Sequence, residues 1–286
     1  VNFAGIMVGS DGKVRPKDNI TRQEATVLIC RALEIAEDTG NLSGFVDSQD
    51  IGSWATGYIN AMAHLGYIAG VGGNRFAPRD NITRAAAITI LDNAIKAVYQ
   101  KEGTYTGNVD GIAVVSASGS VLKDMNISGD IIIAEGVGDG EVVLDSVKVD
   151  GTMIVRGGGV NSIIIKNSSV IPKILVNRKD GVVAVKVEGD TAQVGHISVL
   201  SNGAVISAPM ATVAVAEGVT GAIVNGKTVQ PGETVLAIVG PKDEVKVSPT
   251  IPVATGSKNS GSDSSSPRNT PAPQNGVTAI ALDIEA

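Results

Sequence analysis

The first hundred residues carry apolar side chains at the spacing of an α-helix, and the same spacing occurs twice. After Arg22 and again after Arg84, apolar residues follow at i, i+3, i+4 and i+7, which places them on one helix face. A third stripe follows Ser53 and stops before Gly66, where glycine commonly ends a helix. The three stripes are Ala25, Leu28, Ile29, Ala32, Leu33 and Ala36; Ala87, Ile90, Leu91, Ala94, Ile95 and Val98; and Ala55, Tyr58, Ile59, Met62 and Ala63.

Two nearly identical segments precede the similar helices. Residues 16–22 read Pro-Lys-Asp-Asn-Ile-Thr-Arg and residues 78–84 read Pro-Arg-Asp-Asn-Ile-Thr-Arg. This internal repeat predicts helix–loop–helix units, with part of one unit in residues 1–40 and a complete unit in residues 41–100. Because a pair of helices cannot bury its apolar faces alone, we expect the units to stack, with one or more further units before residue 1.

A different pattern occupies residues 106–248, where short runs of Val, Ile and Leu are separated by Gly, Asp and Asn. The runs recur with a period of about 21 or 22 residues, which is typical of the coils of a parallel β-helix. At about 4.8 Å per coil, on the order of six coils would form a stiff rod roughly 30 Å long. The positions expected to align are Val121, Val142 and Ile163, and Ile131, Met153 and Ile174.

The predicted fold class is therefore α + β multidomain, a helical repeat bundle followed by a parallel β-helix (β-solenoid). Residues 249–276 are rich in Ser, Pro and Gly and are expected to be an extended linker. Residues 277–286 return to a strand-like alternation, so they begin a further β module or pair with an exposed sheet edge.

Composition narrows the function classes. The chain has 23 basic and 29 acidic residues and a net charge of −6, which argues against nucleic acid as a partner. No apolar run approaches the roughly 20 residues that cross a bilayer, and a single cysteine excludes an internal disulfide framework. All aromatic residues precede residue 106, which marks a domain boundary near residues 100–110.

The Thr-Arg pair at the start of each repeated helix is the main candidate for binding chemistry. Arg22 and Arg84 present planar guanidinium groups that can grip a carboxylate, beside helix N-termini that favour anions. Thr21 and Glu24 also have the spacing of a capping box, which needs no ligand, and Thr83 is placed to cap the second helix. Trp54 begins an amphipathic helix, so it either packs in the core or offers a flat face to a sugar ring.

Several motifs together resemble the S-layer homology domain over about residues 1–98. They are Phe45-Val46-Asp47, Trp54-Ala55, Ile59, Gly66-Tyr67-Ile68-Ala69-Gly70, Phe76-Ala77-Pro78 and Ile82-Thr83-Arg84. The resemblance implies a pseudo-threefold helical bundle that binds an acidic secondary cell wall polysaccharide, often a pyruvylated one. The family's Thr-Arg-Ala-Glu motif corresponds here to Thr21-Arg22-Gln23-Glu24 and Thr83-Arg84-Ala85-Ala86, and the second copy lacks the glutamate, which puts that site in doubt.

The leading hypothesis is a non-catalytic, extracellular protein of the cell wall or S-layer, whose solenoid is a rigid spacer or assembly element. Arg22, Arg84, Thr21, Thr83, Glu24 and Trp54 are the predicted glycan-binding residues, and neither a catalytic residue, a metal nor a cofactor is predicted. One alternative is a wall-attached polysaccharide lyase or hydrolase, for which Asp124 and Asp145 could form a stacked carboxylate pair. Another is an adhesin or filament subunit that associates with itself.

Overall fold

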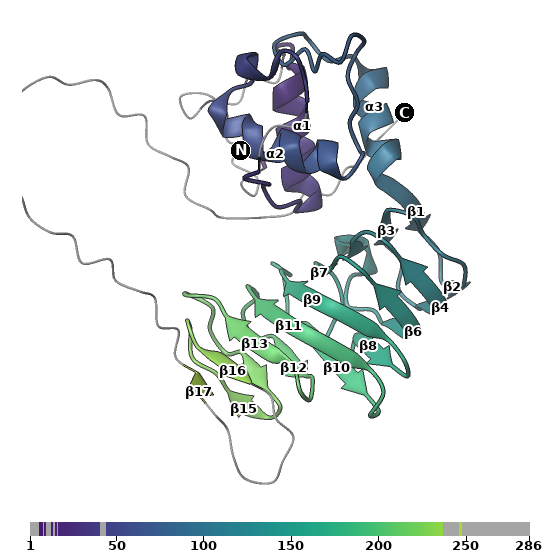
Figure 1. The fold of residues 1–286 in the computed structure, drawn as a ribbon. Coiled ribbons are helices and arrows are strands. Elements are labelled where there is room, and N and C mark those ends of the chain that lie inside the picture. The colour runs from purple at the N-terminus through teal and green to yellow at the C-terminus, as the bar shows by residue number, and fades with distance from the viewer. Residues whose placement is uncertain are drawn as a thin grey trace, which may run out of the picture.

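The computed structural model describes residues 6, 7, 9, 13, 15, 17–40, 44–236, 246 and 247. A helical domain lies against one side of a long β-solenoid that begins at Ile95 (Figure 1). The predicted linker, residues 249–276, and the predicted terminal strand, residues 277–286, lie outside the described residues.

Local signals determine where the three helices begin and end. Thr21 and Thr83 accept hydrogen bonds from backbone N–H groups at the starts of α1 and α3. Gly66 (φ +73°) follows α2 in a left-handed conformation, and the N–H groups of Gly66 and Tyr67 bond to carbonyls of the last helical turn, as in a Schellman motif. The helices are α1 (Arg22–Leu33), α2 (Ser53–His64) and α3 (Arg84–Ala94), with a 3₁₀ turn, η1 (Ser48–Asp50).

The stripe predicted for α2 is largely buried as expected, whereas the stripe predicted for α1 was partly wrong. Leu28, Ile29 and Ala32 are only half-buried, because α1 turns a neighbouring face, with Val27 and Cys30, into the core. Ala55, Ile59 and Met62 of α2 are fully buried and face α1, which contributes Val27 and Cys30. Burial raises the pKa of the Cys30 thiol to about 12, so this thiol is protonated at neutral pH and serves as a packed apolar group.

Two helices are shorter than their stripes predict. The first helix ends at Leu33, and Ala36 is exposed. The second ends at Ala94, because residues Ile95–Tyr99 form strand β1 and pair in parallel with β3. The predicted helical positions Ile95 and Val98 therefore belong to the first coil of the solenoid, which begins inside the range expected to be helical.

Parallel strands stack along two long faces of the solenoid. The first face consists of β1 (Ile95–Tyr99), β3 (Ile112–Val115), β5 (Ile131–Ile133), β7 (Thr152–Val155), β9 (Val170–Val176), β11 (Gln193–Val199) and β13 (Thr212–Val215). The second consists of β2 (Gly103–Tyr105), β4 (Ser120–Ile127), β6 (Val142–Val149), β8 (Ile163–Lys166), β10 (Ala184–Glu188), β12 (Val205–Ser207) and β14 (Ile223–Val224). Val, Ile and Leu fill the interior.

The described strands at the far end of the solenoid pair in a different way. Strands β15 (Lys227–Thr228), β16 (Thr234–Leu236) and β17 (Lys246–Val247) run antiparallel to their neighbours. The parallel stacking that the sequence predicts thus ends in a short antiparallel segment.

A 3₁₀ turn, η2 (Glu135–Val137), forms a corner of the solenoid between β5 and β6.

The observed register tests the predicted alignment residue by residue. Ile131, Met153 and Ile174 stack as predicted, and Val142 pairs with Ile163. Val121 pairs with Val143 and not with Val142, so that prediction was wrong by one residue. The reason is that successive coils differ slightly in length, which a fixed period does not reveal.

The suggested carboxylate pair of Asp124 and Asp145 does not form. Lys123 lies opposite Asp145, whereas Asp124 (φ +50°) occupies a left-handed corner like that of Asn167 (φ +57°). Asp145 instead belongs to a ladder of alternating charge, in which Lys123, Asp145, Lys166 and Glu188 occupy successive coils. Opposite charges on neighbouring strands favour this register.

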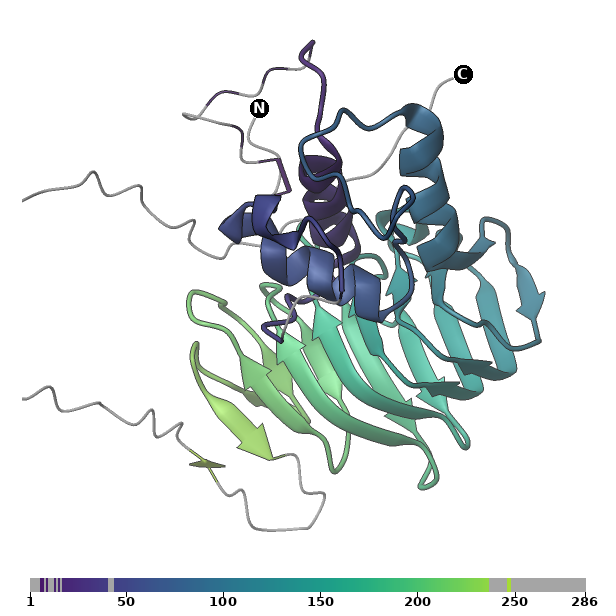
Figure 2. The ribbon, with the colours of Figure 1, turned by 45° about the horizontal axis from the view of Figure 1, so that its top comes forward.

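The outer side of the first solenoid face completes the helical core. Ile112, Ile132 and Ile154 point away from the solenoid interior and belong to the same buried cluster as the helices. Ile132 is 3% exposed and Ile154 is 1% exposed, so the contact excludes water. The helical domain therefore packs along the flank of the solenoid (Figure 2).

A buried ion pair lies at the same interface. Arg156, which follows β7, donates from Nε and Nη2 to Glu34 Oε1 at 3.1 and 2.9 Å, and Asn177 donates to the same oxygen at 3.1 Å. Glu34 caps the C-terminus of α1 with φ +56°, a conformation in which glycine is the usual residue. The side chains of Arg156 and Glu34 are 5% and 3% exposed, so the pair is sealed between the two domains.

Candidate functional site

The two repeated Thr-Arg segments meet at one end of the helical domain. Thr21 and Asn81 form an antiparallel bridge, in which Arg22 N donates to Asp80 O at 2.9 Å and Ile82 N donates to Ile20 O at 3.0 Å. Both α1 and α3 start here and run toward the solenoid (Figure 1), where α1 ends beside Arg156 and α3 continues into β1. The helix N-termini therefore lie at the end of the domain that faces away from the solenoid.

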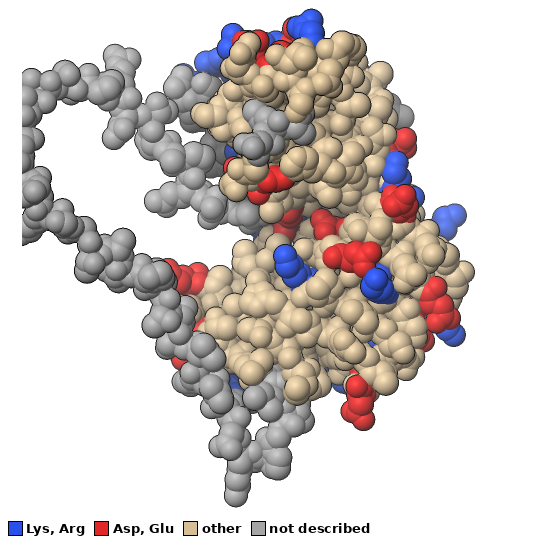
Figure 3. All heavy atoms as spheres, viewed as in Figure 1, with Lys and Arg blue, Asp and Glu red and all other residues tan. Residues whose placement is uncertain are grey.

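Charge is concentrated at this end of the helical domain. Figure 3 shows Lys and Arg side chains, with a few acidic ones, at the end farthest from the solenoid. Arg79, whose side chain is 73% exposed, lies 3.8 Å from Asp50. Positive charges and two helix N-termini together make this end favourable for an anion.

Thr21 and Glu24 form a complete capping box. Glu24 N donates to Thr21 Oγ1 at 3.4 Å, and Thr21 N and Oγ1 donate to Glu24 Oε2 at 2.8 and 2.7 Å. Glu24 remains exposed to solvent although it takes part in the capping box. Capping is the role that the geometry displays for both residues.

Arg22 is largely inside the protein. It is 9% exposed, its Nη2 donates to Ala69 O at 2.9 Å, and its guanidinium carbon lies 5.2 Å from the centre of the Phe76 ring. Burial lowers the pKa of Arg22, and its Nε is buried without a hydrogen-bond partner. The arginine thus holds the loop that contains Ala69 and Phe76, a role that sequence reasoning did not foresee.

Arg84 has the opposite environment. It is exposed at the first position of α3 and makes no ion pair within 4 Å among the described residues. Thr83 Oγ1 accepts from Ala86 N at 3.1 Å, so the helix is capped although Ala86 cannot return the bond that Glu24 returns in α1. The guanidinium of Arg84 is therefore free to meet an external anion.

Trp54 is on the surface, which excludes the core-packing alternative. It is 47% exposed, because the buried face of α2 begins at the next residue, Ala55. A Cβ at Gly52 would lie only 2.5 Å from the indole Nε1, so the ring lies close over the backbone of Gly52. Gly52 N donates to Gln23 Oε1 at 2.9 Å, which joins the start of α2 to the start of α1.

Asp47 organises the loop beneath the arginines. Its two carboxylate oxygens accept from Phe76 N and Ala77 N, each at 2.8 Å, and Arg75 lies 3.8 Å away. The Phe-Val-Asp motif showed only that a repeat opens there. The structural role of Asp47 depends on a loop about thirty residues later, so no local pattern could have revealed it.

This carboxylate predicts a pH dependence. Burial opposes ionisation of Asp47, but the hydrogen bonds from Phe76 and Ala77 and the charge of Arg75 outweigh it and lower its pKa. Because the folded pKa is below the unfolded value of about 3.9, the stabilisation is present above pH 4 and is lost as the pH falls through the folded pKa. Urea unfolding should show a stability gap between wild type and Asp47→Asn that narrows below pH 4. A gap that stays constant down to pH 2 would contradict this.

Among the residues that the structure describes, no group of three or more His, Cys, Asp or Glu side chains is arranged to hold a metal ion. None of the described helices combines the length and the apolar character that a membrane crossing requires.

The helical domain is similar in sequence to known proteins. Residues 4–26 and 44–88 match the S-layer homology domain. The chain is 38% identical over 92 residues to an amylopullulanase of Thermoanaerobacterium thermosulfurigenes and to the exoglucanase XynX of Acetivibrio thermocellus. It is 34% identical over 101 residues to an S-layer protein of Bacillus thuringiensis subsp. finitimus.

These matches cover small parts of much longer proteins. They span 31%, 31% and 35% of this chain, and 5%, 8% and 12% of the three relatives. No solved structure matches the chain significantly. The similarity is therefore limited to one region, and the relatives that contain this region are named as different kinds of protein.

Proposed function

Because residues 4–26 and 44–88 of this chain carry the S-layer homology domain, we propose that the protein attaches to an acidic cell wall polysaccharide through the exposed end of its helical domain. The domain and the S-layer relatives support a cell-surface, wall-anchored location and an S-layer-like role. We infer further that this polysaccharide is pyruvylated and that the protein has a non-catalytic role.

The observation that carries the proposal is the pairing of two helix N-termini beside an unpaired arginine. Arg84 is exposed at the start of α3, and the bridge between Thr21 and Asn81 brings the start of α1 next to it. A guanidinium can bind a carboxylate through two parallel hydrogen bonds, and the two helix N-termini add their positive dipole ends. The first N–H groups of α1 are already bonded to Asp80, Pro78 and Thr21, so the direct contact falls to Arg84. A carboxylate on a sugar, such as a pyruvate ketal, has the chemistry that this end can bind.

The other predicted residues support this contact in different ways. Thr83 shapes the start of α3, and Thr21 with Glu24 shapes the start of α1. Arg22 stabilises the adjoining loop from inside and adds positive charge behind the surface. Trp54 presents an exposed indole over Gly52, whose N–H bonds to Gln23 at the start of α1, and a sugar ring can stack on this indole.

Charge reversal of Arg84 tests the proposal. We expect Arg84→Glu to weaken binding to purified cell walls by about tenfold or more, because a bound carboxylate would lose a charged hydrogen bond and meet a like charge. The measurement is co-sedimentation with walls before and after chemical removal of the secondary polysaccharide.

The matched control is Lys101→Glu, which makes the same charge change at an exposed position between β1 and β2. It should bind like the wild type, and removal of the polymer should abolish binding of both. Equal binding of Arg84→Glu and wild type, or equal binding to both wall preparations, would refute the proposed contact.

A wall-attached glycan-cleaving protein is the second candidate, since two relatives that share the domain are named as an amylopullulanase and an exoglucanase. Incubating the chain with acidic glycans, with and without Ca²⁺, and measuring newly formed reducing ends distinguishes the two. If the protein only attaches to the wall, we expect no new reducing ends to form. Light scattering at increasing protein concentration tests the third candidate, self-association.

A further inference from the structure

A pocket of about 260 Å³ lies at one corner of the solenoid, next to the contact with the helical domain. Three successive coils contribute to it: Glu135 follows β5, Arg156 follows β7, and the segment from Asn177 to Asp180 follows β9. Every lining residue is polar or glycine. The polar groups of these residues therefore favour a hydrophilic ligand.

Three of the side chains that line the pocket are held in place by hydrogen bonds to other residues. Arg156 and Asn177 donate to Glu34 Oε1, and Arg156 also donates to Ala32 O at 2.7 Å. Arg178 donates to Asp139 Oδ1 at 2.6 Å and to Asp180 O at 2.8 Å. These contacts occupy both arginines, so neither guanidinium is a free site for an anion.

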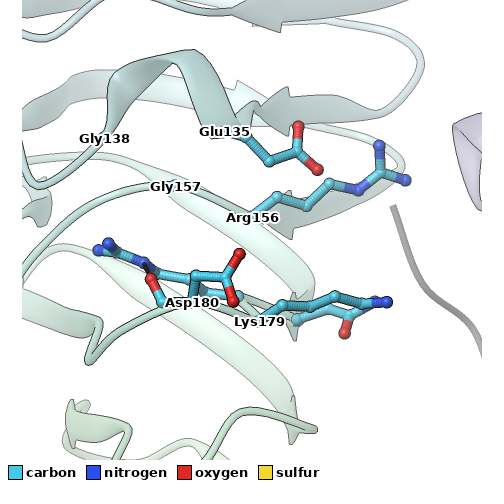
Figure 4. Close-up of a pocket in the computed structure, with 8 residues that line it drawn as sticks. Glu135, Gly138, Arg156, Gly157, Lys179 and Asp180 are labelled. Carbon is cyan, nitrogen blue, oxygen red and sulfur yellow. Dashed lines mark hydrogen bonds between the residues drawn. The ribbon is translucent and has the colours of Figure 1, made fainter. Parts of the chain in front are cut away.

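Other groups in and behind the pocket are not engaged. Glu135 Oε1 is buried without a hydrogen-bond partner, and so is Glu34 Oε2 behind Arg156. Neither Lys179 nor the Asp180 carboxylate makes an ion pair within 4 Å in the part of the chain that the structure describes. Figure 4 shows the Glu135 carboxylate beside the stem of Arg156, with Lys179 extending in the same direction as Arg156.

These unengaged groups interact electrostatically. Burial lowers the pKa of Lys179, and the negative charges of Asp180, Glu135 and Glu34 act on it in the opposite direction. Apart from the two engaged arginines, the charged residues that line the pocket are Glu135, Asp180 and Lys179, so the balance of unpaired charge is negative. A buried acceptor without a donor is unfavourable, so a ligand that brings donors to Glu135 is favoured and an anionic ligand is not.

We propose that this pocket binds one hydroxyl-rich sugar unit that is neutral or carries an amino group. Its hydroxyl or ammonium groups would donate to Glu135 and Asp180, and a ring or hydroxyl oxygen would accept from Lys179. The volume lies slightly below the 300–1,000 Å³ of pockets for drug-sized ligands, which limits the occupant to a single unit. The site is distinct from the Arg84 surface, which lies at the opposite end of the helical domain.

The test is a titration of the full chain with glucose, glucosamine and glucuronate, followed by ¹H–¹⁵N NMR. We expect glucose or glucosamine to shift the amide signals of Gly138 and Gly157, which line the pocket, with glucuronate binding more weakly. Glu135→Gln should weaken this binding by about tenfold or more, while Glu141→Gln, an exposed control, should leave it unchanged.

A second variant guards against misfolding. Asp180→Asn changes an exposed side chain and should also weaken binding while leaving the remaining spectrum intact. The proposal is overturned if neither glucose nor glucosamine shifts the amide signals of Gly138 and Gly157, if glucuronate binds most tightly, or if both variants bind like the wild type. Arg84→Glu should not affect this titration, so failure here and failure of wall attachment are separate results.

Discussion

Arg156→Met should lower the free energy of unfolding by about 3–5 kcal/mol. The substitution removes the partner of Glu34, whose side chain is 3% exposed, and leaves a buried carboxylate without its charged donor. Asn177 would still donate one hydrogen bond, which compensates only part of the loss. Urea unfolding measures the effect, and hydrogen exchange should increase at the ends of α1 and β7.

A second substitution separates the charge effect from the loss of packing. Adding Glu34→Met to Arg156→Met should restore most of the lost stability, because a buried ion pair is often replaceable by apolar side chains of similar volume. Lys148→Met is the surface control: it breaks the exposed pair with Asp150 and should cost about 1 kcal/mol or less. If Arg156→Met cost no more than Lys148→Met, the interface would not depend on this ion pair.

Phe76→Ala should lower the free energy of unfolding by about 3–5 kcal/mol, the usual cost of removing a buried aromatic ring. Phe76 is fully buried, and the centre of its ring lies 5.5 Å from the centre of the Phe45 ring. The same ring lies under the Arg22 guanidinium. The variant should therefore also bind cell walls less tightly, because the loop next to the Thr-Arg segments loses its support.

Phe76→Leu distinguishes packing from the aromatic contact. Leucine keeps much of the volume, so we expect a smaller loss of stability, yet it removes the ring face beneath Arg22. Urea unfolding and wall co-sedimentation measure the two effects side by side. Wall binding by Phe76→Ala that equals wild type in conditions where both are folded would show that this loop does not support the binding surface.

Several features of the candidate site could be predicted because they depend on neighbours in the sequence. The capping roles of Thr21 and Glu24 follow from their spacing, as does the glycine that ends α2. The exposure of Trp54 and the burial of Arg22 could not be predicted, since both depend on how α1 and α2 pack and on the loop that carries Ala69 and Phe76.

By itself, the amino-acid sequence determined the two architectures, since a helical stripe and a coil of about 21 or 22 residues are periodic signals. The stacking of Ile131, Met153 and Ile174 follows from the second of them. Only the tertiary structure decided that the domains share a core. Ile132, Ile154 and Arg156 belong to the solenoid in sequence, yet they face α1 and α2.

The physical reason is distance along the chain. Glu34 and Arg156 are 122 residues apart, and nothing local to either residue marks it as half of an ion pair. In the same way, the helix after Arg84 ends at Ala94 because β3 offers a strand partner to residues Ile95–Tyr99. Local spacing determines which elements can form, and packing between distant segments determines where they end and what they bury.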